Sequence, residues 1–319
     1  MSFRELAQPL RGIIPPMVTP LAGHNQLDEA GLERLVEHMI AGGVHGLFIL
    51  GSCGEGPSLS ARLRRQLIDR TCQCVDSRMP VLVGVTDPCY DESLSLASYA
   101  ADAGADAVVI SAPYYFPINQ SDLLAHFQRF AQESPLPVTL YNMPALTRMS
   151  FEPETVERLA EEESIVGIKD SSGDLDYFQR IERLRQRRPD WTFLIGQEHL
   201  LAPAIERGAD GGVCGGANVW PQVFVQIYDA ALASFDTTIA EERDVLPHLV
   251  DQADRLARIY QLGSQPITAS SVIRGLKSAL AALGICSDAV ALPLQSLSAT
   301  EFRQIAAVLR ELGLPLTMA

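Results

Sequence analysis

The chain has 319 residues, of which 47% are hydrophobic and 20% charged, and its formal net charge is −14 at pH 7. That composition is typical of a globular protein with a large apolar core, and the length suits one large domain or two ordinary ones. The negative charge argues against binding to nucleic acid or to an anionic membrane surface, so an anionic substrate would need local hydrogen-bond donors.

Eight short apolar runs recur along the sequence. They are rich in Val, Ile and Leu and do not alternate apolar with polar residues, which is typical of parallel strands buried on both faces. Amphipathic patterns between them predict helices, for example at residues 28–41, 93–103 and 153–161. The eight runs cover residues 12–19, 46–50, 81–85, 107–111, 138–141, 165–169, 193–196 and 211–214.

This alternation predicts an α/β protein, a closed (β/α)8 TIM barrel. An open doubly wound sheet is the alternative, but the first strand is not followed by the glycine-rich turn that binds dinucleotides. We therefore expect a barrel with the active site in residues 1–222 and a C-terminal helical extension, residues 223–319, packed on the barrel. Helical patterns in the extension occupy residues 222–233, 239–262, 269–283 and 300–312.

No segment of the sequence predicts a membrane span or an export signal. The apolar runs fall short of the roughly 20 residues needed to cross a bilayer, and residues 1–11 carry charges where a signal peptide is apolar. The six cysteines contain no Cys-x-x-Cys pair, and the histidines show no metal-ligand spacing. We expect a cytoplasmic protein with free thiols and no bound metal.

Lysine is rare in this chain, which has 23 arginines and two lysines. Lys169 ends the apolar run 165–169, and unlike a guanidinium its amine can lose a proton and attack a carbonyl to form a Schiff base. Burial penalises the charged form of an amine and so favours this reaction. The alternative is a strand-end lysine that merely reaches solvent. Lys277 lies on a helical pattern, where we expect a structural role.

In a barrel of this kind the active site forms at the carboxyl ends of the strands, which here carry further polar groups. Tyr141 ends the fifth run, and its hydroxyl can move protons to and from a substrate oxygen. An aromatic packing role is the alternative for Tyr141. The turn after the second run contains Gly51, Ser52 and Gly54, whose backbone N–H groups and hydroxyl can form a nest for a carboxylate. Glu55 in the same turn is expected to be structural.

The motifs at these strand ends resemble those of the dihydrodipicolinate synthase/N-acetylneuraminate lyase family of class I aldolases, from about Gly12 to Leu283. The resemblance implies a barrel with a C-terminal helical domain, pyruvate as the common donor, Lys169 as the Schiff-base lysine and Tyr141 as the proton-relay tyrosine. It also implies a second relay tyrosine, Tyr115, which in many members projects into the neighbouring subunit's site of a homotetramer or dimer. The motifs are Gly51-Ser52-Cys53-Gly54-Glu55, Pro113-Tyr114-Tyr115, Tyr141-Asn142-Met143-Pro144-Ala145-Leu146 and Gly167-Ile168-Lys169-Asp170.

Two departures from the family pattern bear on the substrate. Synthases of the family carry an arginine for the carboxylate of aspartate semialdehyde where this chain has Leu146, and Arg148 is displaced from that position by two residues. A buried carboxylate is best held by a bidentate guanidinium, so the change argues against that substrate. The usual pair of hydroxyl residues in the glycine turn is Ser52-Cys53 here, and a thiol is a weak donor.

We therefore expect a lyase, a class I aldolase that reversibly cleaves a 2-oxo acid, best a 2-keto-3-deoxy sugar acid, to pyruvate and an aldehyde. It would need no metal and no organic cofactor, only the covalent imine between Lys169 and pyruvate. Alternatives are dihydrodipicolinate synthase itself, a dehydratase acting on the same Schiff base, and a non-catalytic barrel that senses a 2-oxo acid. The predicted catalytic residues are Lys169, Tyr141, Tyr115 and Ser52. The predicted substrate-binding residues are Gly51, Cys53, Gly54, Leu146, Ser171, Glu198, Val213 and Asn218.

Overall fold

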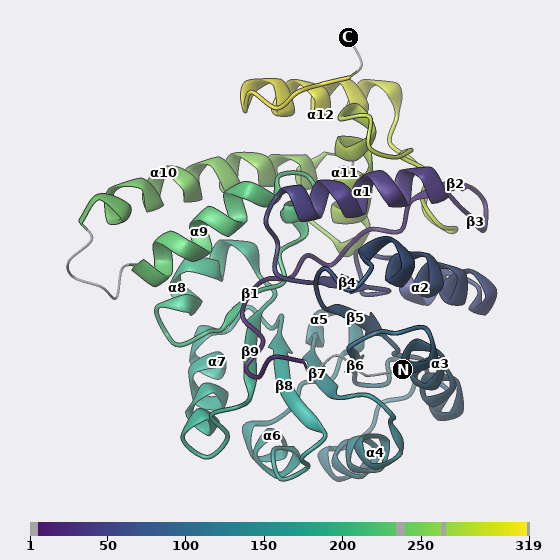
Figure 1. Ribbon diagram of the computed structural model, residues 1–319, viewed down its shortest axis with the longest axis vertical. Helices are drawn as coiled ribbons and strands as arrows, with labels where there is room; N and C mark the ends of the chain where they lie inside the picture. The colour runs from purple at the N-terminus through teal and green to yellow at the C-terminus, as the bar shows by residue number, and fades with distance from the viewer. Residues whose placement is uncertain (1–5, 234–239, 263–265, 318–319) are drawn as a thin grey trace.

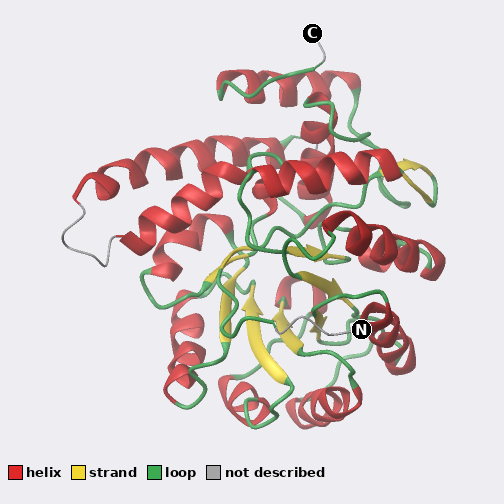
Figure 2. Cartoon of the chain, in the orientation of Figure 1, coloured by secondary structure: helices red, strands yellow, loops and turns green. Residues whose placement is uncertain are grey.

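The computed structural model describes residues 6–233, 240–262 and 266–317 and contains a sheet of eight parallel strands surrounded by helices (Figures 1 and 2). Each of the eight predicted runs overlaps one strand, and every residue of these eight strands is buried, which confirms the (β/α)8 barrel. The strands are β1 (Gly12–Ile13), β4 (Leu47–Ile49), β5 (Val81–Gly84), β6 (Ala107–Ser111), β7 (Val138–Asn142), β8 (Ile165–Asp170), β9 (Thr192–Ile195) and β10 (Gly211–Gly212).

The first and second strands of the barrel close it. The sheet runs in the order β1-β10-β9-β8-β7-β6-β5-β4, and a parallel bridge between Pro16 and Phe48 joins its two ends. The Phe48 N–H donates to the carbonyl of Pro15 at 3.0 Å, and the Met17 N–H donates to the carbonyl of Phe48 at 2.8 Å. Strand β1 is shorter than the predicted run 12–19 because Pro15 and Pro16 have no N–H to give to a ladder.

The helices that follow the strands cover the outside of the barrel (Figure 1). The predicted helix 28–41 is α1 (Glu29–Ala41), which begins where Asp28 accepts a hydrogen bond from the Gly31 N–H at 2.8 Å. A short hairpin, β2 (Leu21–Gly23) with β3 (Gln26–Leu27), precedes it and was not predicted. The other barrel helices are α2 (Ala61–Val75), α3 (Tyr90–Asp102), α4 (Gln120–Glu133), α5 (Pro144–Thr147), α6 (Pro153–Leu159), α7 (Leu175–Glu182) and α8 (Leu201–Ile205).

The C-terminal extension consists of α9 (Pro221–Ala233), α10 (Ala240–Leu256), the 3-10 turn η5 (Ala257–Gln261), α11 (Ala269–Ala282) and α12 (Ala299–Glu311). These are the predicted helices, although the predicted start at Ile239 lies outside the described residues. One hydrophobic core joins the extension to the barrel, because buried Phe224, Ile259 and Leu276 belong to the same cluster as the barrel residues. Within the described ranges, no helix is both long and apolar enough to span a bilayer.

Candidate active site

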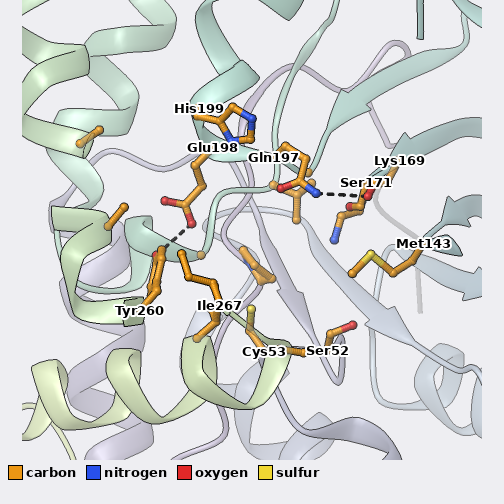
Figure 3. Close-up of a pocket in the computed structure, with 18 of the residues that line it drawn as sticks. Ser52, Cys53, Met143, Lys169, Ser171, Gln197, Glu198, His199, Tyr260 and Ile267 are labelled. Atoms are coloured by element: carbon orange, nitrogen blue, oxygen red, sulfur yellow. Dashed lines mark hydrogen bonds between the residues drawn. The ribbon is translucent and has the colours of Figure 1, made fainter. Parts of the chain in front are cut away.

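A cavity of about 390 Å³ lies between the carboxyl ends of the strands and the C-terminal helices, and we call it the lysine cavity (Figure 3). In this view Lys169 and Met143 are at one side and Glu198 and Tyr260 at the other. The barrel side is lined by Ser52, Cys53, Tyr141, Met143, Lys169, Ser171 and Val213. The opposite side comes from α9, α10, η5 and α11, through Ile227, Val250, Ala253, Ala257, Tyr260 and Val272.

Lys169 and Tyr141 are held side by side by the register of two strands. They are partners in the parallel pairing of β7 and β8, so both side chains point to the same face of the sheet. The Lys169 Nζ lies 4.0 Å from the centre of the Tyr141 ring and 5.0 Å from that of Phe48. Only 4% of Lys169 is exposed. The alternative of a lysine that merely reaches solvent is therefore wrong.

The turn after β4 brings Ser52 and Cys53 to the same cavity. The Ser52 Oγ lies 3.4 Å from the Tyr141 hydroxyl oxygen, which makes Tyr141 the link between Lys169 and the turn. Burial raises the pKa of Cys53 to about 11, so this thiol is neutral at pH 7. Gly54, in the same turn, does not line the cavity, and its carbonyl accepts a hydrogen bond from the Thr19 hydroxyl at 2.6 Å.

Ser171 and Glu198 also line the cavity, as predicted. Ser171 is buried next to Gly196, where an added Cβ would collide with the Ser171 Oγ and come within 3.1 Å of the Lys169 Cε. A glycine at this position therefore leaves the lysine and the serine room to lie together.

The Glu198 Oε1 accepts hydrogen bonds from the Gly216 N–H and the Tyr260 hydroxyl, both at 2.9 Å. Burial raises the pKa of Glu198.

Asn142 and Asp170 pair at the register position next to that of Tyr141 and Lys169. The Asn142 side-chain amide donates to the Asp170 carboxylate at 2.7 Å, and the two residues are partners across β7 and β8. Both are fully buried, and burial raises the pKa of Asp170. Because side chains alternate along a strand, this pair lies on the opposite face from Tyr141 and Lys169.

Besides Gly54, four predicted residues lie outside the lysine cavity: Asn218, Leu146, Tyr115 and Gly51. Asn218 does not line the cavity: its amide accepts from the Val18 N–H and donates to the carbonyls of Pro16 and Gly215, so it is structural and its predicted contact with substrate is wrong. Leu146, which is 44% exposed, lies at a second cavity of about 230 Å³ that shares Ser52, Tyr141 and Met143 with the first. Tyr115 is 75% exposed and lines neither cavity.

Gly51 lines the second cavity, together with Leu146. Other lining residues were missed, among them Met143, Gln197 and Tyr260 of the lysine cavity. Gln197 donates to the carbonyl of Ser171 at 3.3 Å, and its place directly after the seventh strand was an available signal. Tyr260 comes from the helical extension, and nothing in its local sequence indicates that it reaches the barrel.

In the part of the chain that the structure describes, no three His, Cys, Asp or Glu side chains are grouped so that they could hold a metal ion. Lys169 is the sole lysine or arginine among the described residues that line the lysine cavity, whereas Glu198 and Asp254 are acidic. The site therefore offers an amine, a phenol and hydroxyls for chemistry.

Comparison with known proteins identifies relatives along nearly the whole chain. Residues 9–312 match the Dihydrodipicolinate synthetase family. A 4-hydroxy-tetrahydrodipicolinate synthase from Salinibacter ruber is 34% identical over 286 residues, 89% of each chain. The structure of a dihydrodipicolinate synthase from Bacteroides thetaiotaomicron superimposes with a TM-score of 0.89 at 43% identity, covering 95% of this chain and 99% of that one.

YagE of Escherichia coli K12, whose provisional name is 2-dehydro-3-deoxy-D-gluconate aldolase, is 37% identical over 221 residues, 69% of this chain and 73% of YagE. Its structure in complex with pyruvate has a TM-score of 0.86 at 31% identity and covers 96% of this chain and 100% of that one. These relatives and the barrel lead to the same conclusion: the chain belongs to the dihydrodipicolinate synthetase family of enzymes.

Proposed function

We propose that this protein is a class I aldolase that joins pyruvate to an aldehyde, and reverses that reaction, through an imine on Lys169. The observation that carries the proposal is the buried Lys169 amine beside Tyr141, whose hydroxyl lies 3.4 Å from that of Ser52. An amine adds to a 2-oxo acid to give a carbinolamine, and loss of water from the carbinolamine gives the imine. Tyr141 supplies and removes the protons of these steps, and Ser52 relays them.

In the cleavage direction the imine forms at C2 of the longer 2-oxo acid. The C3–C4 bond then breaks, its electrons move to C3 and the imine nitrogen as an enamine, and the hydroxyl at C4 loses its proton as the aldehyde leaves. Protonation of C3 gives the imine of pyruvate, and water releases pyruvate from Lys169. In this scheme the turn that contains Ser52 and Cys53 binds the carboxylate through backbone N–H groups and the Ser52 hydroxyl.

The aldehyde portion is proposed to be uncharged and hydroxylated, as in a 2-keto-3-deoxy sugar acid. Support comes from the described lining of the lysine cavity, where Lys169 is the single lysine or arginine and Glu198 and Asp254 are acidic residues. A second substrate carboxylate would therefore lose its water without gaining a cationic partner, which is unfavourable. The hydroxyl of Ser171 and the amide of Gln197 offer hydrogen bonds to a hydroxylated chain instead. The provisional name of YagE points to the same substrate class.

The second candidate is condensation of pyruvate with aspartate semialdehyde, because relatives from several organisms are named 4-hydroxy-tetrahydrodipicolinate synthase. The test is to incubate the protein with 2-keto-3-deoxygluconate and follow pyruvate release, and in parallel with pyruvate and aspartate semialdehyde. We expect pyruvate release in the first assay. Turnover of the semialdehyde alone would make the second candidate correct.

We further propose that the protein acts as a homo-oligomer in which Tyr115 completes the site of a neighbouring copy. Tyr115 and Phe116 are 75% and 73% exposed, and their rings contact each other edge to face at 5.0 Å. Two large aromatic side chains at the surface suit an interface between copies. Sedimentation analysis of the wild type and of Tyr115→Asp would test this, since a monomeric wild type would contradict it.

A further inference from the structure

The second lysine of the chain forms a buried ion pair with the turn that carries Ser52. Lys277, on α11, is fully buried, and its amine pairs with the Glu55 carboxylate, which is 1% exposed. Lys277 also donates to the carbonyl of Ala289 at 2.7 Å, and the Glu55 Oε2 accepts from the Ala291 N–H at 2.6 Å. Two charges are thus removed from water between α11, the segment that follows it and the turn after β4.

Glu55 is also part of the backbone that shapes the turn. Its backbone φ of +58° lies in the left-handed region, which is uncommon for residues other than glycine. The surrounding structure must therefore hold Glu55 in this conformation. The Glu55 N–H donates to the Ser52 carbonyl at 3.1 Å. The side-chain anchor at Glu55 therefore acts directly on the residue whose hydroxyl approaches Tyr141.

Burial of such a pair is costly because both ions lose their hydration, and their mutual attraction and added hydrogen bonds offset that cost only when the geometry is good. We propose that the Glu55–Lys277 pair positions the turn containing Ser52 so that it can bind pyruvate. Helix α11 and the segment 287–291 would then help to set the geometry of the active site. Glu55 and Lys277 are positioning residues here, since they reach the substrate only through the turn. This inference rests on the proposed function for its kinetic consequences.

The test compares the wild type with the double variant Glu55→Gln/Lys277→Met, which removes both charges and leaves an amide oxygen to accept from Ala291. Kinetics are measured well below the melting temperature of each protein. We expect the KM for pyruvate to rise about tenfold and the KM for the aldehyde to change less than about twofold, the pattern of a defect confined to one substrate. A general loss of stability would not raise the KM for pyruvate while leaving the KM for the aldehyde nearly unchanged.

A control neutralises a second, partly buried ion pair by the same kinds of substitution. Arg185 pairs with Asp210 at 2.8 Å, and Asp210 lies just before β10, at the amino end of the barrel strands and away from the lysine cavity. The variant Arg185→Met/Asp210→Asn should leave both KM values unchanged. If it raises the KM for pyruvate as much as the first variant does, the effect is general and the inference is wrong.

Hydrogen exchange measured by mass spectrometry tests the positioning role without any measurement of enzyme activity. In the Glu55→Gln/Lys277→Met variant the peptide over residues 51–56 should exchange faster, and the peptide over residues 165–171 should not. If the wild type has no activity with pyruvate, the proposed function fails and exchange alone decides the positioning role. Should the double variant not fold, Glu55→Gln carries the same comparison. Unchanged exchange at 51–56 together with an unchanged KM for pyruvate would overturn the inference.

Discussion

Tyr141 and Lys169 are register partners on β7 and β8, and the lysine amine lies 4.0 Å from the centre of the tyrosine ring. The pair needs no loop to assemble it, because the strand ladder itself brings the two side chains together. The Asn142–Asp170 hydrogen bond at the next register position reinforces that alignment from the other face.

Tyr141→Phe should slow turnover roughly 100- to 10,000-fold while leaving imine formation with pyruvate detectable, because it removes the proton relay and keeps the aromatic volume. The measurements are kcat for aldol cleavage and the yield of pyruvate adduct after borohydride reduction. Near-normal kcat would reduce Tyr141 to a packing residue.

Ser52→Ala should lower kcat/KM for pyruvate about tenfold, the scale of one lost hydrogen bond. Its neighbour Cys53 provides the control. The neutral Cys53 thiol is a weak donor, so Cys53→Ala should cost less than about threefold. Equal losses in the two variants would mean that the hydroxyl of Ser52 has no special part.

Aspartate semialdehyde should be a poorer acceptor than glyceraldehyde by about 100-fold in kcat/KM, since a desolvated carboxylate without a partner costs roughly 2–5 kcal/mol. The comparison is made at saturating pyruvate. A preference for the semialdehyde would show that a cation reaches the site from outside the described lining.

Leu146→Arg identifies which cavity the acceptor occupies. Leu146 lies at the second cavity, so a guanidinium there should improve the semialdehyde relative to glyceraldehyde if the acceptor enters that cavity. If the acceptor lies against α10 and α11 in the lysine cavity, the ratio of the two kcat/KM values should stay as it is in the wild type.

Glu198→Gln should raise the melting temperature at pH 8, and the gain should disappear at acidic pH. Burial raises the pKa of Glu198 above its ordinary value of 4.5, so the folded state holds the proton more tightly than the unfolded state. The ionised carboxylate therefore costs stability above the folded-state pKa, and the cost vanishes as pH falls to the ordinary value. Glutamine keeps an oxygen for the Gly216 N–H and the Tyr260 hydroxyl. A lower melting temperature at pH 8 would show that the charge itself stabilises the fold.

The barrel and the buried Lys169 of the lysine cavity could be predicted from the sequence because both leave strong local signals. Strands buried on both faces read as continuous apolar runs, and Lys169 stands out in a chain that has 23 arginines and only one other lysine. The hairpin β2–β3 was missed because its strands are only three and two residues long. The interruption of β1 follows from Pro15 and Pro16, whose effect on the ladder depends on a partner strand that the local sequence does not reveal.

The residues on the far side of the lysine cavity could not be predicted from the sequence, for a different reason. Val250, Tyr260 and Val272 face the lysine because α10, η5 and α11 fold back over the barrel, and such long-range packing leaves no mark in a helical pattern. Asn218 follows a strand in the same way as residues that line the lysine cavity do, yet its amide binds the backbone at Pro16, Val18 and Gly215. Position at a strand end therefore predicts nearness to the site, while the hydrogen-bond partners determine the role.

The most direct measurement of the central claim is to trap the imine. The protein is incubated with pyruvate, reduced with borohydride and digested, and the adduct is located by peptide mass spectrometry in the wild type and in Lys169→Arg. Because the chain has only two lysines, the readout is sharp. We predict one pyruvyl adduct on the peptide containing Lys169 and none in Lys169→Arg, whose guanidinium stays charged. An adduct on Lys277, or no adduct in the wild type, would contradict the account.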